Sequence, residues 1–377
     1  MIARKMPPIT LAGHPLAPIG MGQHFRAVFR ALAKVYVSTS IVDIYGADRP
    51  DPELYAEFSP HHAAEIGEGI NIFCINGDEI AAARTHLKNR KIGAGYNIVF
   101  PMWELPRYPA VWARELETFD EVWTASEFTR QSIAQAVSKP VHVAGLGCEV
   151  HRMALHSRRK FRIPESSYAF LFAYDFLSFQ DRKNPFAVIQ AFREVVERLP
   201  DADIALVVKT NHKSRRPDQY DSLIEQLKDV QDRVVLIDET LSDAEMKCLL
   251  HLCDCFVSLH RSEAFGFGIA EAMYLSKPVI VTAYSGNMEY CDPTSARCVG
   301  YDLIPVAPNA YPHWQDQQWA DAHVAEAADA MINFLRNPEE GRALGRRANA
   351  QMKTNFSYRA IGLRYLNRLD GIVGESS

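Results

Sequence analysis

The chain has 377 residues, of which 47% are hydrophobic and 23% charged, with 41 basic and 46 acidic side chains. This composition is typical of a globular chain of about two domains and excludes a disulfide mini-protein or a disordered tail. The formal net charge of −5 argues against a nucleic-acid-binding protein, which would carry a clearly basic domain.

Short apolar runs alternate with amphipathic stretches in the first half, a pattern that predicts βα units around a parallel sheet. The predicted strands are 9–13, 37–46, 71–76, 97–101, 121–126 and 141–147. The predicted helices are 22–35, 78–88, 109–119 and 126–137. The alternation stops in the polar, basic stretch 150–167, which we interpret as a linker.

A second alternating series follows the linker. Its predicted strands are 168–176, 202–210, 233–239, 255–260 and 277–283. Pro185 occupies the first turn of a predicted amphipathic helix, and Ser242 with Glu245 forms a capping box that opens another. After about residue 318 the pattern is mostly helical.

These patterns predict an α/β chain of two Rossmann-like, doubly wound domains with C-terminal helices. We assign residues 1–160 to the first domain and 161–350 to the second, with a helical tail at 351–377 packing back on the first. Ligands of such sheets bind outside the carboxyl ends of the strands, so we expect a site in the cleft between the two domains.

Two features bear on location and on metal binding. No run approaches the roughly 18 apolar residues of a membrane span, and the first residues lack a secretory signal, so we expect a cytoplasmic protein. The seven cysteines are odd in number and scattered, which favours free thiols in a reducing compartment. Cys253 and Cys255 lack the further ligands of a zinc site, so no metal is expected.

Segment 260–271 is the most informative part of the sequence. It places Glu263 beyond a strand end, Gly266 and Gly268 in a loop, and Glu271 in the first turn of the next helix. The glycines would let the backbone approach a ligand, the helix start would hold a phosphate, and the carboxylates would suit sugar hydroxyls. Alternatively, both glutamates are solvated and the two phenylalanines of the segment belong to the core.

The whole segment resembles the donor-binding signature of the retaining GT-B glycosyltransferases called family 4, which consists of Glu, seven residues and Glu. Ala264 stands where that family usually has glycine. The resemblance extends to residues 174–192 and 103–133, in the order that the family has them, and includes bacterial enzymes that build surface polysaccharides. It implies that 1–160 binds the acceptor and 161–350 the nucleotide-sugar donor.

The resemblance also implies roles for individual residues. Glu271 would bind the ribose of the donor, and Glu263 would contact the transferred sugar. The intervening backbone would hold sugar hydroxyls or the distal phosphate, at Phe265, Gly266, Phe267 and Gly268.

Basic residues of the second domain would neutralise the leaving diphosphate. Lys183 lies in the family's basic position, where a cation stabilises the breaking bond. The arginine that the family often places earlier corresponds here to Leu177, so Arg182 is the candidate substitute. Lys209, at a strand end, is a further candidate, with a solvated strand-end lysine as the alternative.

The Gly/Pro loop 13–25 of the first domain contains Gly20 and Gly22. Their spacing alone is too weak for a dinucleotide fingerprint, but in the resembling family this loop closes over the donor diphosphate and acceptor. His14 and His24 flank the glycines and are better explained as structural groups than as ligands.

Two further polar residues are candidates. Many relatives have a histidine facing the transferred sugar where this chain has Trp103 and Glu104, so Glu104 could bind a hydroxyl or accept a proton, or could instead pair with Arg107. Asn287 lies where the family approaches the donor sugar, although Ser-Gly-Asn is also ordinary turn chemistry.

The sequence therefore predicts transfer of a sugar from a nucleoside-diphosphate sugar, such as a GDP- or UDP-sugar, to a hydroxyl of a glycan or lipid-linked acceptor. The resemblance implies retention of configuration, and no cofactor is expected. The alternatives are a nucleotide-sugar epimerase and a non-catalytic nucleotide-sugar-binding module. The basic stretches 156–160 and 213–216 could contact an anionic acceptor or the inner face of a membrane, or be solvated loops.

Overall fold

The computed structural model describes residues 6–46, 51–87 and 95–375. The chain forms two compact units, the first comprising residues 1–148 with 354–377 and the second residues 149–353. Each unit is built on a six-stranded parallel sheet, and a separate two-stranded sheet belongs to the second unit. The predicted α/β class with two doubly wound sheets is confirmed.

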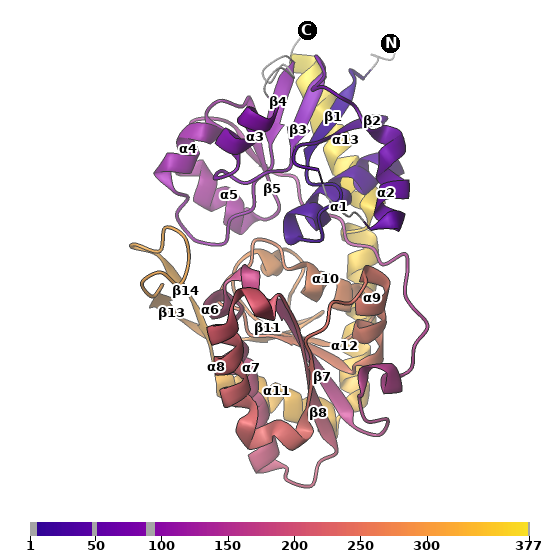
Figure 1. The fold of residues 1–377 in the computed structure, drawn as a ribbon, viewed down its shortest axis with the longest axis vertical. Coiled ribbons are helices and arrows are strands. Elements are labelled where there is room, and N and C mark those ends of the chain that lie inside the picture. The colour runs from indigo at the N-terminus through magenta and orange to yellow at the C-terminus, as the bar shows by residue number, and fades with distance from the viewer. Residues whose placement is uncertain (1–5, 47–50, 88–94, 376–377) are drawn as a thin grey trace. The chain divides into compact units, whose positions relative to one another are not determined.

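The first sheet has the strand order β2-β1-β3-β4-β5-β6. Its strands are β1 (Ile9–Gly13), β2 (Thr39–Asp43), β3 (Ile70–Phe73), β4 (Tyr96–Val99), β5 (Glu121–Thr124) and β6 (Val141–Val143). The helices of this unit are α1 (Gly20–Lys34), α2 (Pro52–Phe58), α3 (Ile80–His86), α4 (Ala110–Leu116), α5 (Glu127–Ala134) and α13 (Tyr358–Glu375). Helix α13 runs beside α1, whereas α3, α4 and α5 lie on the other side of the sheet (Figure 1).

The end of the chain is bound into the first unit by polar contacts. Arg368 of α13 donates to the carboxylate of Glu121, which is fully buried, at 2.6 Å. Tyr365 donates its hydroxyl hydrogen to the carbonyl of Gly145 at 2.7 Å. These contacts explain why residues 354–377 belong to the unit in which the chain begins.

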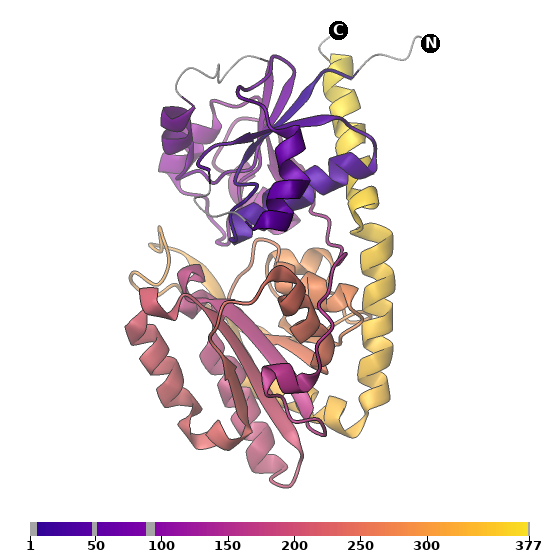
Figure 2. The ribbon, with the colours of Figure 1, turned by 45° about the vertical axis from the view of Figure 1, so that its right-hand side comes forward.

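The second sheet has the order β12-β11-β10-β7-β8-β9. Its strands are β7 (Tyr168–Asp175), β8 (Ile204–Asn211), β9 (Val234–Ile237), β10 (Cys255–Ser258), β11 (Val279–Thr282) and β12 (Arg297–Val299), and the separate hairpin contains β13 (Tyr301–Pro305) and β14 (Gln318–Ala322). The helices are α6 (Gln180–Lys183), α7 (Pro185–Arg198), α8 (Pro217–Leu227), α9 (Asp243–Leu252), α10 (Phe267–Tyr274), α11 (Val324–Arg336) and α12 (Pro338–Asn355). Figure 2 shows α7 and α8 on one face of this sheet and α9 and α10 on the other.

The central strands are mostly apolar because helices cover both faces of each sheet. All residues of β1, β10 and β11 are buried. The helix starts follow the predicted local chemistry, since Pro185 opens α7 and Ser242 with Glu245 forms the capping box of α9. All seven cysteines are free thiols, and six of them are buried.

The first unit ends earlier than we expected. Residues 149–160 were assigned to the first domain, but they belong to the second unit. Ala154 donates its N–H to the carbonyl of Ala244, and Arg158 binds the carboxylate of Asp254 at 2.7 Å. Arg158 of the basic stretch 156–160 is therefore bound within the second unit and is not part of a solvated loop.

No helix within residues 6–46, 51–87 or 95–375 combines the length and the apolar character that a membrane crossing requires.

Candidate functional site

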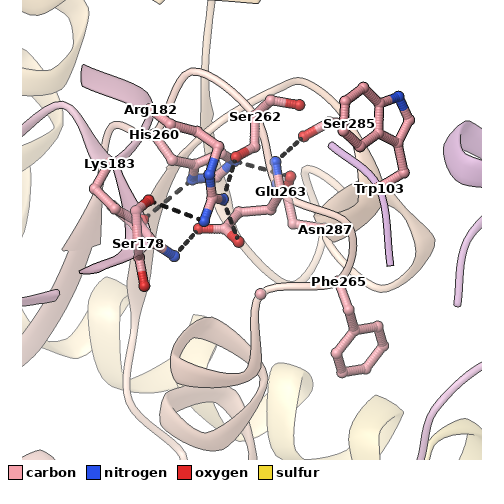
Figure 3. A network of polar contacts seen from close by, with 12 residues as sticks. Trp103, Ser178, Arg182, Lys183, His260, Ser262, Glu263, Phe265, Ser285 and Asn287 are labelled. Carbon is pink, nitrogen blue, oxygen red and sulfur yellow. Dashed lines mark hydrogen bonds and ion pairs between the residues drawn. The ribbon is translucent and has the colours of Figure 1, made fainter. Parts of the chain in front are cut away.

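A cluster of charged side chains lies at the carboxyl edge of the second sheet. The segments that follow β7, β10 and β11 meet there, because the carboxyl ends of parallel strands share one edge. Figure 3 shows Arg182 and Lys183 converging on the carboxylate of Glu263. The first two residues come from α6, after β7, and the third from the loop between β10 and α10.

Glu263 is held by one cation on each carboxylate oxygen. Arg182 Nη1 lies 3.1 Å from Oε2, and Lys183 Nζ donates to Oε1. Arg182 is further fixed by donating to the carbonyls of Ser262 at 2.8 Å and Ser178 at 3.2 Å. Only about a twentieth of Arg182 is exposed, whereas Lys183 keeps a fifth of its side chain in contact with solvent, so the lysine is the cation that a ligand can reach.

The electrostatic balance keeps Glu263 ionised. Burial of the carboxyl group raises its pKa, but the charges of Lys183 and Arg182 together outweigh burial and lower the pKa to about 2. At neutral pH the group can accept hydrogen bonds and stabilise positive charge. It has no proton to give as a general acid.

The loop that carries Glu263 is braced from the segment after β11. The backbone N–H of Glu263 donates to Ser285 Oγ at 2.8 Å, and the N–H of Gly286 donates to the carbonyl of Glu263 at 2.8 Å. Ser285 adopts φ 74°, which is unusual for a residue with a side chain. Backbone strain of this kind persists where surrounding contacts enforce it. Here it places the hydroxyl of Ser285 where it accepts the N–H of Glu263.

Asn287 supports the same loop from inside. Its Oδ1 lies 3.0 Å from His260 Nε2, its Nδ2 donates to the carbonyl of Thr282 at 3.1 Å, and the residue is fully buried. Burial lowers the pKa of His260, which keeps the ring neutral. The amide group of Asn287 is therefore engaged within the protein, and its predicted contact with sugar hydroxyls stays a prediction.

The start of α10 offers backbone donors at the same edge. Gly266 precedes the helix at φ 89°, a left-handed conformation that favours glycine. Phe265 is buried against the ring of Tyr290, whose hydroxyl lies 2.7 Å from the carbonyls of Phe265 and Gly266. Four backbone N–H groups of this turn have no acceptor within the described ranges, as expected for a helix start. They belong to Phe265, Gly266, Phe267 and Gly268.

Glu271 is the fifth residue of α10, just beyond the first turn in which it was predicted, and it forms a second buried ion pair. Lys247 of α9 donates to Glu271 Oε1 at 2.5 Å and lies 3.0 Å from a carboxylate oxygen of Asp243. Burial lowers the pKa of Lys247, but the carboxylates of Glu271 and Asp243 outweigh it and raise the pKa above its usual value. Sequence reasoning missed Lys247, because no motif connects a helical lysine to a carboxylate 24 positions later.

Lys209 lies at the end of β8 and is buried. Its Nζ donates to the carbonyl of Thr210 at 2.5 Å and to Asn211 Oδ1 at 2.6 Å. Burial lowers the pKa of Lys209 to about 8, although the charges of Asp175 and Asp238 oppose this. Lys209 therefore loses its positive charge at mildly alkaline pH. Its predicted contact with a diphosphate stays a prediction.

The glycines predicted in the first unit lie where α1 begins. Gly20 is the first residue of the helix and is exposed, with open space where a Cβ would be. Gly22 is required by packing, since a Cβ there would lie 2.1 Å from the carbonyl of Ala17. Arg26 holds this loop by donating to the same carbonyl at 3.0 Å.

The remaining polar candidates of the first unit are partly or fully buried. His14 lies 2.9 Å from a carboxylate oxygen of Glu79. His24 is fully buried against the ring of Phe100, and burial lowers its pKa to about 3, as for a structural histidine. Glu104 is half-buried in the segment after β4, and its predicted role stays a prediction.

Two doubly wound parallel sheets in one chain, with a charged cluster at the carboxyl edge of the second, are typical of the GT-B class of glycosyltransferase folds. The structure is similar to HepE of Anabaena in complex with UDP and glucose, with a TM-score of 0.69, 12% identity, and coverage of 97% of this chain and 100% of that one. It is also similar to sucrose-phosphate synthase from Thermosynechococcus elongatus, with a TM-score of 0.68, 16% identity, and coverage of 98% and 100%.

The model of the family described as glycosyl transferases group 1 matches residues 156–351, which is just over half of the chain. The protein belongs to this family, which confirms the resemblance at the level of group 1. Trehalose synthase of Pyrococcus horikoshii is 25% identical over 199 residues, 52% of this chain and 43% of that protein. The chain thus matches less than half the length of that relative.

Proposed function

We propose that the protein transfers a sugar from a nucleoside-diphosphate sugar to a hydroxyl of a glycan or lipid-linked acceptor, with retention of configuration. The observation that carries the proposal is the ionised carboxylate of Glu263, held between Arg182 and Lys183 beside the open start of α10. Membership of the group 1 family supports the reaction class, and the motif resemblance implies retention.

Glu263 would act on the transferred sugar. Because its pKa is held at about 2 by the two cations, the carboxylate stays charged throughout catalysis. A fixed negative charge beside the sugar stabilises the positive charge that develops as the bond to the phosphate breaks, and it can accept a hydrogen bond from a sugar hydroxyl.

Lys183 would neutralise the leaving diphosphate. An ammonium group has three donors, and Glu263 Oε1 engages Lys183 from one side, so a phosphate oxygen can share the same group. The N–H groups at the start of α10 would add partial positive charge at this edge. This positive charge comes from the protein, and the proposal requires no cofactor.

Glu271 would accept hydrogen bonds from the ribose. Its ion pair with Lys247 fixes the orientation of the carboxylate, as a binding group needs. The first unit would provide the acceptor side through the loop of Gly20 and Gly22 and through Glu104.

Binding tests the proposal first. UDP, GDP and their glucose and mannose derivatives should be screened by thermal shift and calorimetry, and at least one should stabilise the protein. Lys183→Ala should weaken its binding by tenfold or more, whereas Lys228→Ala, which removes an exposed lysine paired with Glu225, should not change it. If no nucleotide sugar binds, the proposed function is wrong.

Turnover separates the proposal from its rivals. With glycan acceptors, nucleoside diphosphate should be released much faster than without them, and NMR of the product should show the anomeric configuration of the donor. Recovery of an epimerised nucleotide sugar would indicate an epimerase. Binding without turnover across a broad acceptor panel would indicate a non-catalytic binding module.

A further inference from the structure

The hairpin of β13 and β14 is attached to the loop that carries Glu263. Arg261, two residues before Glu263, is the junction, and its side chain lies 3.1 Å from a carboxylate oxygen of Asp321 in β14. Its guanidinium stacks over the ring of Trp319 at 5.5 Å, and its carbonyl accepts the N–H of Ala320 at 3.0 Å. Side chain and backbone of Arg261 therefore both hold the hairpin.

The same arginine also holds the helix that supplies the two cations. The backbone N–H of Arg261 donates to the carbonyl of Arg182 at 2.7 Å. Its Nη1 donates to the carbonyl of Asp181 at 3.0 Å. A displacement of Arg261 would therefore move α6 and the Glu263 loop together.

The turn segment 306–317 of the hairpin packs directly on Arg182. The ring of Tyr311 is buried and lies 5.8 Å from the guanidinium of Arg182, within the range of a cation–π contact. The same ring contacts Phe179, with 4.7 Å between ring centroids. Since Phe179 immediately precedes α6, Tyr311 covers both the start of that helix and its arginine.

We propose that the hairpin Tyr301–Ala322 is a positioning element for the donor site, acting through Arg261 and Tyr311 on Arg182 and hence on the Glu263 carboxylate. Tyr311 holds the guanidinium over one carboxylate oxygen, which leaves the other oxygen to Lys183. Asp321 balances the charge of Arg261, so that Arg261 does not compete for Glu263. The catalytic meaning of this arrangement rests on the proposed function.

A double-mutant cycle tests the positioning without any substrate. Urea unfolding of Tyr311→Leu, Glu263→Gln and the double variant should show coupling, because Tyr311 acts through the Arg182–Glu263 pair. We expect the double variant to have an unfolding equilibrium constant at least fivefold smaller than the product of the two single effects predicts. Tyr311→Phe keeps the ring and should keep the wild-type coupling.

A residue of the same hairpin provides the matched control. Leu303 is half exposed on β13, and Leu303→Ala should be additive with Glu263→Gln. If Tyr311→Leu is equally additive, the hairpin does not position Glu263 and the proposal is overturned.

Kinetics supply the readout that a purely structural role would not change. With UDP-glucose or GDP-mannose, whichever the wild type uses, Tyr311→Leu should lower kcat tenfold or more and leave the donor KM within twofold, while Tyr311→Phe restores kcat. An unchanged kcat would overturn the proposal. If the wild type binds neither UDP nor GDP, the proposed function fails, and the double-mutant cycle still decides the positioning.

Discussion

Replacing Glu263 by glutamine should destabilise the second unit at neutral pH and much less in acid. The cations at Lys183 and Arg182 lower the pKa of this carboxyl from 4.5 to about 2, even though burial opposes them. At about 1.4 kcal/mol per pH unit the difference corresponds to about 3 kcal/mol of stability. Glutamine has the shape of the protonated acid, so the substitution should lose that amount at pH 7.

The pH dependence gives the prediction its sign. A carboxyl group with a lowered pKa in the folded state contributes stability above pH 4.5, and that contribution is lost as the pH falls towards 2. The difference between wild type and Glu263→Gln should therefore shrink to roughly half by pH 3.

Urea unfolding followed by tryptophan fluorescence measures both effects, because Trp319 is buried in the second unit. Glu339→Gln is the control, since Glu339 pairs with Arg342 at the exposed surface and its removal should not measurably change the midpoint. Equal urea midpoints of wild type and Glu263→Gln at pH 7, or a deficit that stays constant down to pH 3, would refute the ion-pair reasoning.

Three further substitutions test other buried charges. Lys247→Met should lower the free energy of unfolding by about 3 kcal/mol, because it leaves the Glu271 carboxylate buried without its cation. Adding Glu271→Gln should recover part of this loss in chemical denaturation, and a double variant no more stable than the single one would contradict the reasoning. Arg368→Met should destabilise the first unit by a similar amount, since Glu121 is fully buried, and unchanged protease resistance of the C-terminal helix would count against it. Lys209→Met should raise the free energy of unfolding at pH 7, because burial lowers the pKa of Lys209 and so makes its charged form costly in the folded state. The increase in stability should shrink as the pH rises from 8 to 10.5, since the unfolded wild type binds more protons than the folded one in that window. An increase that does not depend on pH would show that the charge of the lysine does not destabilise the fold.

Most of the sheets could be predicted from the sequence because parallel strands buried on both faces are continuous apolar runs. The prediction for 9–13 coincides with β1. Flanking residues made other predicted strands too long: 233–239 was predicted where β9 spans Val234–Ile237. The hairpin Tyr301–Ala322 and helix α2 were not predicted. The residues of β13 are mostly exposed, and the hairpin is held by tertiary contacts with Arg261 and Arg182, which leave no periodic pattern in the sequence.

The candidate site, too, could be predicted from the sequence only in part. Glu263 and Glu271 are conspicuous in the sequence because they lie eight positions apart with two glycines between them. The contacts that fix their ionisation join residues far apart in the chain, and Lys183 lies 80 positions before Glu263. From the sequence we expected Lys183 to bind the diphosphate, and its ion pair with Glu263 was not predicted. Charge pairing at such separations depends on how the sheet brings its strand ends together.

The return of the chain to its first unit has a consequence for biosynthesis. Glu121 is made 247 residues before Arg368, the cation that neutralises it, and the whole second unit is synthesised in between. During synthesis all residues of the second unit are made before α13, so until α13 is made the first sheet lacks the arginine that pairs with the buried Glu121 carboxylate. We therefore expect the nascent first unit to need the last helix before it becomes resistant to proteases.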